Sequence, residues 1–301
     1  MKINYSQEVK SAKDSGKPIL TLESTIIAHG MPFPQSLDFA NQAESLCRDS
    51  GVTPATIAIL EGKIKVGLEQ ADLEFITNND SVKKVSQREI GIALSEKWNG
   101  ATTVSSTMHI AHTAGIPVFA TGGIGGVHRG ADLSFDISQD LTALSQIPMI
   151  VISAGAKAIL DLPKTLEMIE TLGITTLGYG VNEFPAFYSR ESGCFGIHPV
   201  SSPSNIAAIY KKNISAGLSS AVLVANPVPI ENEIPVSEIE SIIDDACEAA
   251  KTQNILGKSL TPFLLKEIVE KTEGRSLETN KALALNNIKL GIEIAQGLGD
   301  F

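Results

Sequence analysis

Short runs of apolar, often β-branched residues alternate with amphipathic stretches along almost the whole chain. This alternation restricts the fold more than any other feature of the sequence. The strand-like runs span 19–22, 55–60, 64–68, 117–120, 149–153, 174–179 and 221–225. Several are continuously apolar, as expected for strands that are covered on both faces. Strands that alternate with helices predict a layered α/β architecture.

The amphipathic stretches have the spacing of helices. They span 36–50, 160–172, 204–215 and 236–250, and residues 261–298 continue the helical pattern with a break near Gly274. The strand-like runs 55–60 and 64–68 flank Glu61, Gly62 and Lys63, which predicts a hairpin and therefore a mixed sheet. The sequence contains no linker, repeat or low-complexity tract. We therefore expect a single domain over residues 1–301 with a helical C-terminal end.

Composition excludes several classes of protein. Lys plus Arg number 24 and Asp plus Glu number 34, so the net charge is −10. A general nucleic-acid binder needs a basic surface, which this balance opposes, although a small phosphorylated ligand needs only a few local donors. Three scattered cysteines give neither a disulfide framework nor a structural zinc motif. Without a signal peptide or a membrane-spanning run, we expect a cytoplasmic protein.

The segment ESTIIAHG, residues 23–30, places a carboxylate directly after a predicted strand. The carboxyl ends of strands are where α/β proteins hold active groups. Glu23 is therefore a candidate general acid or base whose pKa is tuned by apolar neighbours. The alternative is a helix cap or a loop carboxylate in a salt bridge.

The segment ATGGIGGVHRGADLSFDIS, residues 120–138, places four glycines directly after a strand. Glycines let backbone N–H groups approach an anion closely, and His128 and Arg129 add cationic donors, so a phosphate or sugar phosphate is the predicted ligand. A flexible turn is the alternative. Asp132, Asp136 and Asp140 recur at four-residue spacing, and their oxygens suit Mg²⁺ or Mn²⁺, although acids in a first helical turn are also common.

Lys157 follows an apolar strand in VISAGAKAILD, residues 151–161. A lysine at the end of a buried strand is desolvated, which favours the uncharged and nucleophilic amine. We therefore interpret Lys157 as a lysine that forms a Schiff base or a related adduct. The alternative is a lysine that reaches solvent or pairs with a carboxylate.

Other polar and aromatic residues carry less information. The hydroxyl- and amide-rich segments 99–107 and 276–287 can supply neutral donors to a phosphate or a base, but such residues are ordinary in caps and loops. Four histidines lack metal-like spacing and are interpreted as structural: His29, His109, His112 and His198. The aromatic residues between Tyr179 and Phe195 are more typical of a core than of a stacking platform.

Taken in order, these segments resemble a known family. The motifs ESTIIAHGMPFPQ, PATIAI, NGATTVSST, VFATGGIGGVHRGA, FDIS, AGAK, ILDL, VANP and TPFLL are similar to those of the pseudouridine-5′-phosphate glycosidases, the indigoidine synthase A-like family, from about residue 18 to residue 295. The resemblance implies a three-layer α/β/α fold with a mixed central sheet, a homotrimer and a bound divalent metal, most often Mn²⁺. It also implies reversible conversion of pseudouridine 5′-phosphate to uracil and ribose 5-phosphate.

The resemblance also assigns residues. It implies that Glu23 is the catalytic acid, that Lys157 forms the covalent adduct and that Asp136 binds the metal. Substrate contacts are implied for Lys84, Val104, His128, Ser138, Gln139, Asp140 and Asn280. The doublet of Lys83 and Lys84 leaves open which lysine reaches the phosphate, and the segment 182–199 matches poorly, so its role is open.

The chemistry explains this set of residues. The ribose C1′ is bonded to uracil C5, so no heteroatom leaves. We expect Glu23 to assist opening of the ribose ring and Lys157 to add to C1′, after which protonation of C5 lets the C–C bond break and water hydrolyses the iminium. Three alternative hypotheses compete with this function. They are a Schiff-base aldolase or lyase acting on another sugar phosphate, a non-catalytic sugar-phosphate binder and a carbohydrate kinase that lacks a P-loop.

Overall fold

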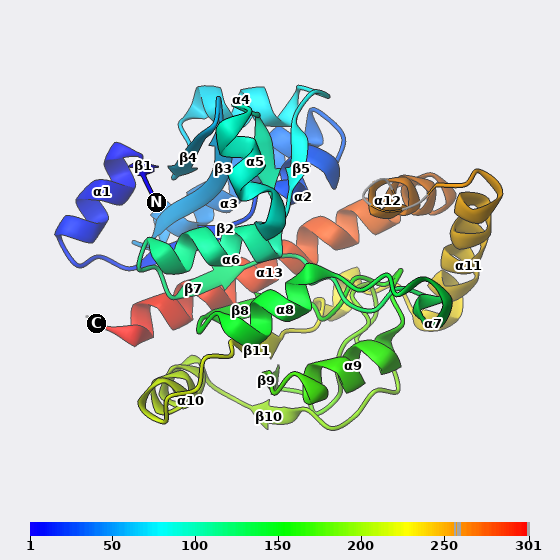
Figure 1. Ribbon diagram of the computed structural model, residues 1–301. Coiled ribbons are helices and arrows are strands. Elements are labelled where there is room, and N and C mark those ends of the chain that lie inside the picture. The colour runs from blue at the N-terminus through cyan, green and yellow to red at the C-terminus, as the bar shows by residue number, and fades with distance from the viewer. Residues whose placement is uncertain (256, 258–259, 300–301) are drawn as a thin grey trace.

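An eleven-stranded sheet runs through the molecule (Figure 1). The computed structural model describes residues 1–255, 257 and 260–299. The main path of the sheet has the order β1-β4-β3-β2-β7-β8-β11-β9-β10, and β6 pairs with β3 and β5. The strands are β1 (Ile3–Tyr5), β2 (Ile19–Leu22), β3 (Thr53–Leu60), β4 (Lys63–Val66), β5 (Lys83–Val85), β6 (Gly100–Thr102), β7 (Val118–Ala120), β8 (Ile150–Ser153), β9 (Thr175–Tyr179), β10 (His198–Val200) and β11 (Val222–Ala225).

The sheet is mixed, as predicted. Strands β2, β7, β8, β11 and β9 pair in parallel, whereas β3 pairs antiparallel with β4 and β6. The predicted hairpin between β3 and β4 turns at Glu61 and Gly62, which both adopt positive φ angles of 50° and 69°. Two positive φ angles in a two-residue loop match the right-handed twist of the strands that it joins.

Helices cover both faces of the sheet, which confirms the three-layer α/β/α fold (Figure 1). Helices α3, α13 and α10 form one layer, and α6 and α8 lie on the opposite face. The helices are α1 (Gln7–Asp14), α2 (Thr25–His29), α3 (Gln35–Asp49), α4 (Gln70–Thr77), α5 (Ile90–Ser95), α6 (Val104–Thr113), α7 (Ala131–Ser134), α8 (Gln139–Gln146), α9 (Leu162–Thr171), α10 (Pro203–Ser215), α11 (Val236–Thr252), α12 (Leu260–Lys271) and α13 (Arg275–Leu298), with 3₁₀ turns η1 (Gln87–Glu89) and η2 (Ile230–Asn232).

Local signals explain where the predicted helices begin and end. Asp161 caps α9 by accepting a hydrogen bond from the Lys164 N–H, and Ser202 caps α10 in the same way from the Asn205 N–H. Gly274 separates α12 from α13 with a φ of 86°, a conformation that glycine adopts without strain. Every predicted strand and helix is present with small shifts at its ends. The three-residue strands β1, β5, β6 and β10 were not predicted.

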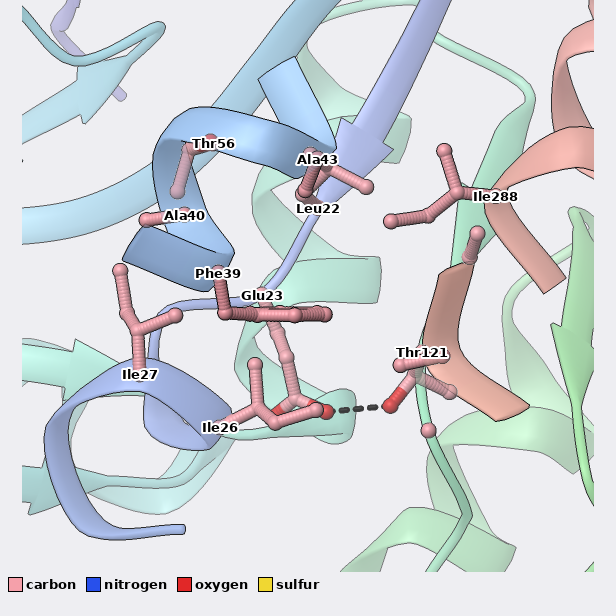
Figure 2. Close-up of a pocket in the computed structure, with 13 residues that line it drawn as sticks. Leu22, Glu23, Ile26, Ile27, Phe39, Ala40, Ala43, Thr56, Thr121 and Ile288 are labelled. Atoms are coloured by element: carbon pink, nitrogen blue, oxygen red, sulfur yellow. Dashed lines mark hydrogen bonds between the residues drawn. The ribbon is translucent and has the colours of Figure 1, made fainter. Parts of the chain in front are cut away.

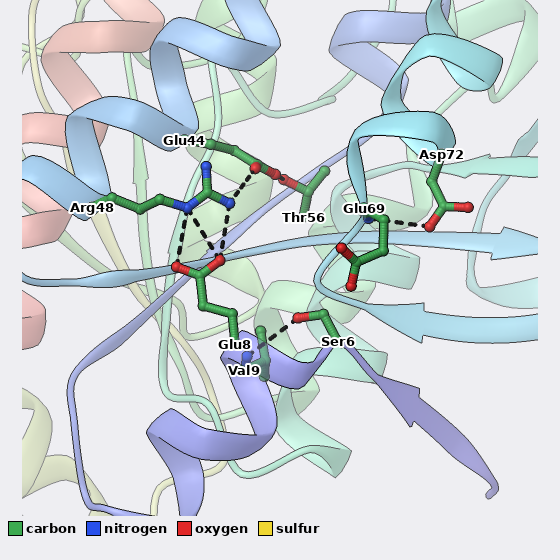
Figure 3. Close-up of polar contacts among 8 residues, drawn as sticks. All are labelled: Ser6, Glu8, Val9, Glu44, Arg48, Thr56, Glu69 and Asp72. Atoms are coloured by element: carbon green, nitrogen blue, oxygen red, sulfur yellow. Dashed lines mark hydrogen bonds and ion pairs between the residues drawn. The ribbon is translucent and has the colours of Figure 1, made fainter.

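A buried carboxylate joins three elements beside the sheet (Figure 3). Glu44 of α3 is 3% exposed and accepts hydrogen bonds from Thr56 of β3 at 2.7 Å and from Arg48 at 2.8 Å. Arg48 also pairs with Glu8 of α1 at 3.0 Å. Because a buried charge is tolerated only when it is paired, this network fixes α1 and α3 against β3. None of the helices in the described part of the chain has the length and apolarity that crossing a bilayer requires.

Candidate active site

Four neighbouring parallel strands end at one edge of the sheet, and each is followed by a polar side chain. Glu23 follows β2, Thr121 follows β7, and Asn226 follows β11. Lys157 follows β8 after a short turn. The carboxyl ends of parallel strands meet at the same edge, which is where α/β proteins bind ligands. The structure therefore brings together Glu23 and Lys157, the two residues for which the sequence predicted chemistry.

Glu23 is buried at this edge, with 6% of its surface exposed. Its carboxylate accepts a hydrogen bond from the Thr121 hydroxyl, and the side chains of Ile26, Phe39 and Ile288 lie around it in a small apolar pocket (Figure 2). Burial raises the pKa of Glu23 above its usual value, while the positive charge of Lys157 and the Thr121 hydrogen bond oppose that rise. A carboxyl group in this setting is suited to carry a proton.

Lys157 is held by backbone hydrogen bonds on both sides. Its N–H donates to the Ile124 carbonyl at 3.1 Å, and its carbonyl accepts from the Leu160 N–H at 3.0 Å. The side chain is partly exposed and lines the same cavities as Glu23. The hydrogen-bonded turn after β8 therefore places the side chain at the cavity wall without exposing it fully to solvent.

Two adjacent cavities meet at this pair of residues. The polar lobe has a volume of about 530 Å³ and is lined by charged and polar side chains, including Lys84, His128 and Ser138. The apolar lobe is narrower, and Ile26, Phe187, Pro262 and Leu265 form much of its wall. Both lobes share Glu23, Thr25, Lys84, Lys157 and Thr261. A ligand with one anionic end and one flat apolar end would thus have its middle beside Lys157.

The two lysines of the doublet have different surroundings in the structure. Lys84 lines the polar lobe, whereas the Lys83 ammonium lies 3.9 Å from the centre of the Trp98 ring in a cation–π contact. Consecutive residues of a strand point to opposite faces, so only one of the two can reach the cavity from β5. His128 lines the same lobe; burial lowers its pKa, which Asp136 opposes and Lys84 and Lys157 reinforce.

The four glycines of the loop 122–126 allow close packing rather than an unusual turn, because their φ angles are not positive. A Cβ atom at Gly125 would lie 2.2 Å from the Ser138 hydroxyl, and one at Gly123 would lie 2.6 Å from the Phe187 ring. The Gly125 N–H donates to Asp140 at 2.9 Å. A carboxylate of the protein therefore occupies the Gly125 N–H, and the role of the loop as a phosphate site stays a prediction.

The residues that follow Asp136 bind protein groups as well as lining the polar lobe. Asp140 is 5% exposed, and its two oxygens accept the N–H groups of Ser105 at 3.0 Å and Gly125 at 2.9 Å. Ser138 caps α8, and the Gln139 side chain accepts from the Arg88 N–H at 3.3 Å. Asp140 therefore joins α6, α8 and the glycine loop, and this fixes the floor of the lobe.

The row of three aspartates does not form one metal site. Asp132 is exposed and lies 3.7 Å from the Lys164 ammonium, and the Asp140 carboxylate accepts two backbone N–H groups. Asp136 lines the cavity, and its carboxylate makes neither kind of contact among the described residues. Over the described ranges, no group of three or more His, Cys, Asp or Glu side chains gathers to hold a metal ion. One carboxylate at the wall of a roomy cavity still fits a divalent cation that keeps most of its waters.

Val104 lies at the first position of α6, and its side chain is buried, with 1% exposed. Its neighbours Thr103 and Ser105 line the polar lobe. The structure therefore places the start of α6 at the site, but not the Val104 side chain. Of the residues that the resemblance assigned to the substrate, Val104 is the one whose side chain points elsewhere.

The apolar lobe contains residues that sequence reasoning did not assign to the site. Phe187, which adopts a φ of 66°, forms part of the wall, and its N–H donates to the Ala154 carbonyl at 3.2 Å. His29 lines the lobe as well, and burial, reinforced by Lys84, lowers its pKa. The segment 182–199 thus supplies one wall of the site through Phe187. The signal of this wall in the sequence is the row of aromatic residues, a pattern that is also typical of a core.

Two buried polar atoms of this lobe have no hydrogen-bond partner within the described structure: His29 Nε2 and Asn280 Oδ1. An unpaired buried polar atom costs roughly 1–3 kcal/mol, so such atoms are found where a ligand or water completes them. Asn280 of α13 is 5% exposed and lies beside Gly122. The structure places Asn280 in the wall of the same cavity as Lys157 and Glu23, with a side-chain oxygen that a ligand donor could reach, and its contact with the substrate stays a prediction.

The fold and this site define an α/β protein whose ligand cavity opens at the carboxyl edge of the sheet, around a lysine and a buried carboxylate. The family model described as "Indigoidine synthase A like protein" matches residues 8–297. The chain therefore belongs to the indigoidine synthase A-like family, as its motifs predicted.

Relatives of this chain carry consistent names. It is 50% identical to a pseudouridine-5′-phosphate glycosidase of Staphylococcus aureus (strain MW2) over 97% of this chain and 95% of that protein. It is 49% identical to one of Paracoccus denitrificans (strain Pd 1222), covering 98% of each. Such similarity over nearly the full length shows that the protein is an enzyme of this family.

Two solved structures share the fold. An indigoidine synthase A-like protein of Thermotoga maritima is 40% identical with a TM-score of 0.89, over 97% of this chain and 95% of that one. A prealnumycin C-glycosynthase in complex with ribulose 5-phosphate is 32% identical with a TM-score of 0.90, over 98% of this chain and 96% of that one. The α/β/α architecture is thus common to both structures.

Proposed function

We propose that this protein cleaves, reversibly, the C–C glycosidic bond of pseudouridine 5′-phosphate to give uracil and ribose 5-phosphate. The observation that carries the proposal is the position of Lys157 and Glu23 where the polar lobe meets the apolar lobe. The names of relatives at about 50% identity support this substrate, and the ribulose 5-phosphate bound to the C-glycosynthase supports a pentose phosphate ligand.

The two lobes match the two ends of this substrate. The phosphate and ribose would occupy the polar lobe, where Lys84, His128 and Ser138 supply donors. The uracil would occupy the apolar lobe against Phe187, where the unpartnered oxygen of Asn280 would accept a hydrogen bond from a uracil N–H. In this orientation the bond between C1′ and C5 lies beside Lys157, so binding itself aligns the reacting atoms.

The reaction needs an acid and a neutral amine. Glu23 would protonate the ring oxygen O4′ as its bond to C1′ breaks, which leaves C1′ conjugated with the uracil and electrophilic. The Lys157 amine then adds to C1′. Protonation of uracil C5 lets the C1′–C5 bond break, and the nitrogen lone pair of Lys157 forms an iminium at C1′. Water hydrolyses the iminium, releases ribose 5-phosphate and regenerates the amine.

Asp136 would hold the divalent metal, Mn²⁺ in this proposal, as its one carboxylate ligand from the polar lobe. When bound, the metal would supply positive charge that organises water and the phosphate. His128, Ser138 and Lys84 would position the phosphate beside it. A homotrimer, implied by the family resemblance, is part of the same proposal, and sedimentation equilibrium tests it.

The test is the release of uracil from pseudouridine 5′-phosphate in the presence of Mn²⁺, followed by chromatography. Unphosphorylated pseudouridine serves as the substrate control and Lys157→Ala as the enzyme control. We expect release from the phosphate only, and only with the wild-type enzyme. Release from neither substrate would overturn the proposal and direct the search to other sugar phosphates that form an adduct with Lys157.

A further inference from the structure

A buried chain of amides lies directly behind Glu23. Asn287 of α13 is fully buried, and its side-chain N–H donates to the Thr121 carbonyl at 2.8 Å and to the Gly122 carbonyl at 3.3 Å. Its side-chain oxygen accepts a hydrogen bond from the Asn226 amide at 3.0 Å. Asn226, which follows β11, is held in turn by its own N–H, which donates to the Ser153 carbonyl at 2.8 Å.

This chain ends on the acid of the proposed reaction. Thr121 and Gly122 are the first two residues after β7, where the strand gives way to the glycine loop. The Thr121 hydroxyl donates to the Glu23 carboxylate. We propose that Asn287 is a positioning residue: aligned by Asn226, its amide holds the Thr121 and Gly122 carbonyls so that the Thr121 hydroxyl stays on Glu23. The proposal rests on the role given to Glu23 in the proposed function.

Both polar atoms of the Asn287 side chain have hydrogen-bond partners, which supports a role in orienting the groups that it contacts. An apolar side chain of similar volume would fill the same space without the cost of burying polar atoms. A fully bonded buried amide instead fixes the orientation of the groups it contacts. Here those groups are the carbonyls of Thr121 and Gly122 at the end of β7, and the Thr121 side chain contacts Glu23. Asn287 thus reaches Glu23 through one intermediate residue only.

The charges that face Glu23 set the direction of the expected effect. They are Lys157 after β8, Lys84 of β5 and Asp140 of α8. The two lysines and the Thr121 hydrogen bond lower the pKa of Glu23, whereas burial and Asp140 raise it. Weakening the Thr121 hydrogen bond alone therefore raises the pKa of Glu23 further. Since Glu23 acts as an acid, the alkaline limb of the rate profile should move to higher pH.

The experiment compares three single variants of the full chain. Thr121→Val removes the hydrogen bond directly, and Asn287→Ala removes its support. Asn286→Ala is the matched control, because Asn286 is the preceding residue of the same helix and its amide donates at 3.1 Å to the Pro227 carbonyl instead. The measurements are the pH dependence of kcat and the titration of the Glu23 carboxyl by ¹³C NMR, with the Glu23 signal assigned by its absence in Glu23→Gln.

We expect Thr121→Val and Asn287→Ala to shift both titrations to higher pH, and Asn286→Ala to leave them as in the wild type. We also expect Asn287→Ala to lower kcat by up to about 10²-fold, because misplacement of a reacting group has effects of that size. A lower Tm with unchanged titrations would show a purely structural role and would overturn the proposal. If Asn287→Ala does not fold, Asn226→Ala is measured by the same criteria.

The NMR titration separates this inference from the proposed function. If the wild-type protein does not release uracil, the proposed function fails, yet a shifted Glu23 titration in Asn287→Ala still supports the positioning role. If uracil is released and the Glu23 titration of Asn287→Ala matches the wild type, the positioning role fails alone.

Discussion

Lys157 lies close enough to Glu23 for its positive charge to lower the pKa of that carboxyl, although the two residues follow strands that are separated in the sheet by β7. Burial acts on Glu23 in the opposite sense and is the larger effect. The pair therefore holds a carboxyl that is protonated more readily than an ordinary glutamate beside an amine on one cavity wall. An acid and a nucleophile of this kind are what ring opening followed by amine addition requires.

The Lys157 amine should form a covalent adduct with ribose 5-phosphate. The aldehyde and the amine lose water to form an imine, and borohydride supplies the hydride that converts it to a stable secondary amine. We expect mass spectrometry to find the added mass on the peptide that contains Lys157. Lys157→Ala should abolish both the adduct and turnover, whereas Lys83→Ala, which alters a lysine outside the cavity, should retain them. Near-normal turnover of Lys157→Ala would contradict the scheme.

Replacing the buried Glu23 with a neutral residue should lower the activity and raise the stability of the folded protein. Because the pKa of Glu23 is raised in the folded protein, folding binds a proton there, and the stability of the wild type falls as pH rises from the ordinary glutamate value through the raised one. Glu23→Gln is neutral throughout. We expect it to lower kcat by about 10²–10⁴-fold and to raise the Tm above that pH window, with each 1 kcal/mol worth about 2 °C.

The same pair of measurements on Glu167→Gln gives the control, since Glu167 lies on the exposed side of α9. That variant should change neither kcat nor the pH dependence of the Tm. A Glu23→Gln protein that is less stable than the wild type at neutral pH would show that pairing with Lys157 and Thr121 outweighs burial.

The arrangement of Glu23 and Lys157 could be predicted because each follows a continuously apolar strand. Parallel strands bring their carboxyl ends to one edge, so residues far apart in the sequence meet there without any knowledge of side-chain packing. Six helices were predictable for a similar reason, since their apolar spacing and caps are local: α3, α9, α10, α11, α12 and α13. The other helices were not predicted from the sequence. These features needed only the pattern along the chain.

Phe187 and His29 could not be assigned to the site by the same reasoning. An aromatic residue in a loop gives the same signal whether it faces the core or a ligand, and Phe187 does both, packing against Gly123 while it lines the apolar lobe. Strand β5 was missed because three residues that include Lys83 and Lys84 show no apolar periodicity. The hydrogen bonds that Asp140 accepts could not be predicted from the sequence either, because their donors belong to α6 and the glycine loop.

Close packing of the glycine loop gives a third prediction. In Gly125→Ala, the new Cβ would meet Ser138 and the Asp140 carboxylate at 2.2–2.8 Å, and Asp140 cannot move without losing two backbone hydrogen bonds. We expect a loss of about 1–3 kcal/mol in the free energy of unfolding and a loss of activity. Gly91→Ala in α5, where no described atom beyond the adjoining residues and the local helix backbone lies within 4 Å of the new Cβ, should be neutral or stabilising. Denaturant unfolding checks both, and equal effects would contradict the packing argument.

The unpartnered oxygen of Asn280 gives the fourth prediction. Among the residues that the structure describes, this buried acceptor has no hydrogen-bond partner, so Asn280→Leu removes a destabilising group and should leave the Tm unchanged or higher. In the complex, the oxygen would accept a uracil N–H, and its loss should lower kcat/KM by about 10–100-fold, the equivalent of 1–3 kcal/mol. Asn286→Leu on the preceding position should leave kcat/KM unchanged. A Tm that falls together with unaltered kcat/KM would show that Asn280 supports the helix rather than the ligand.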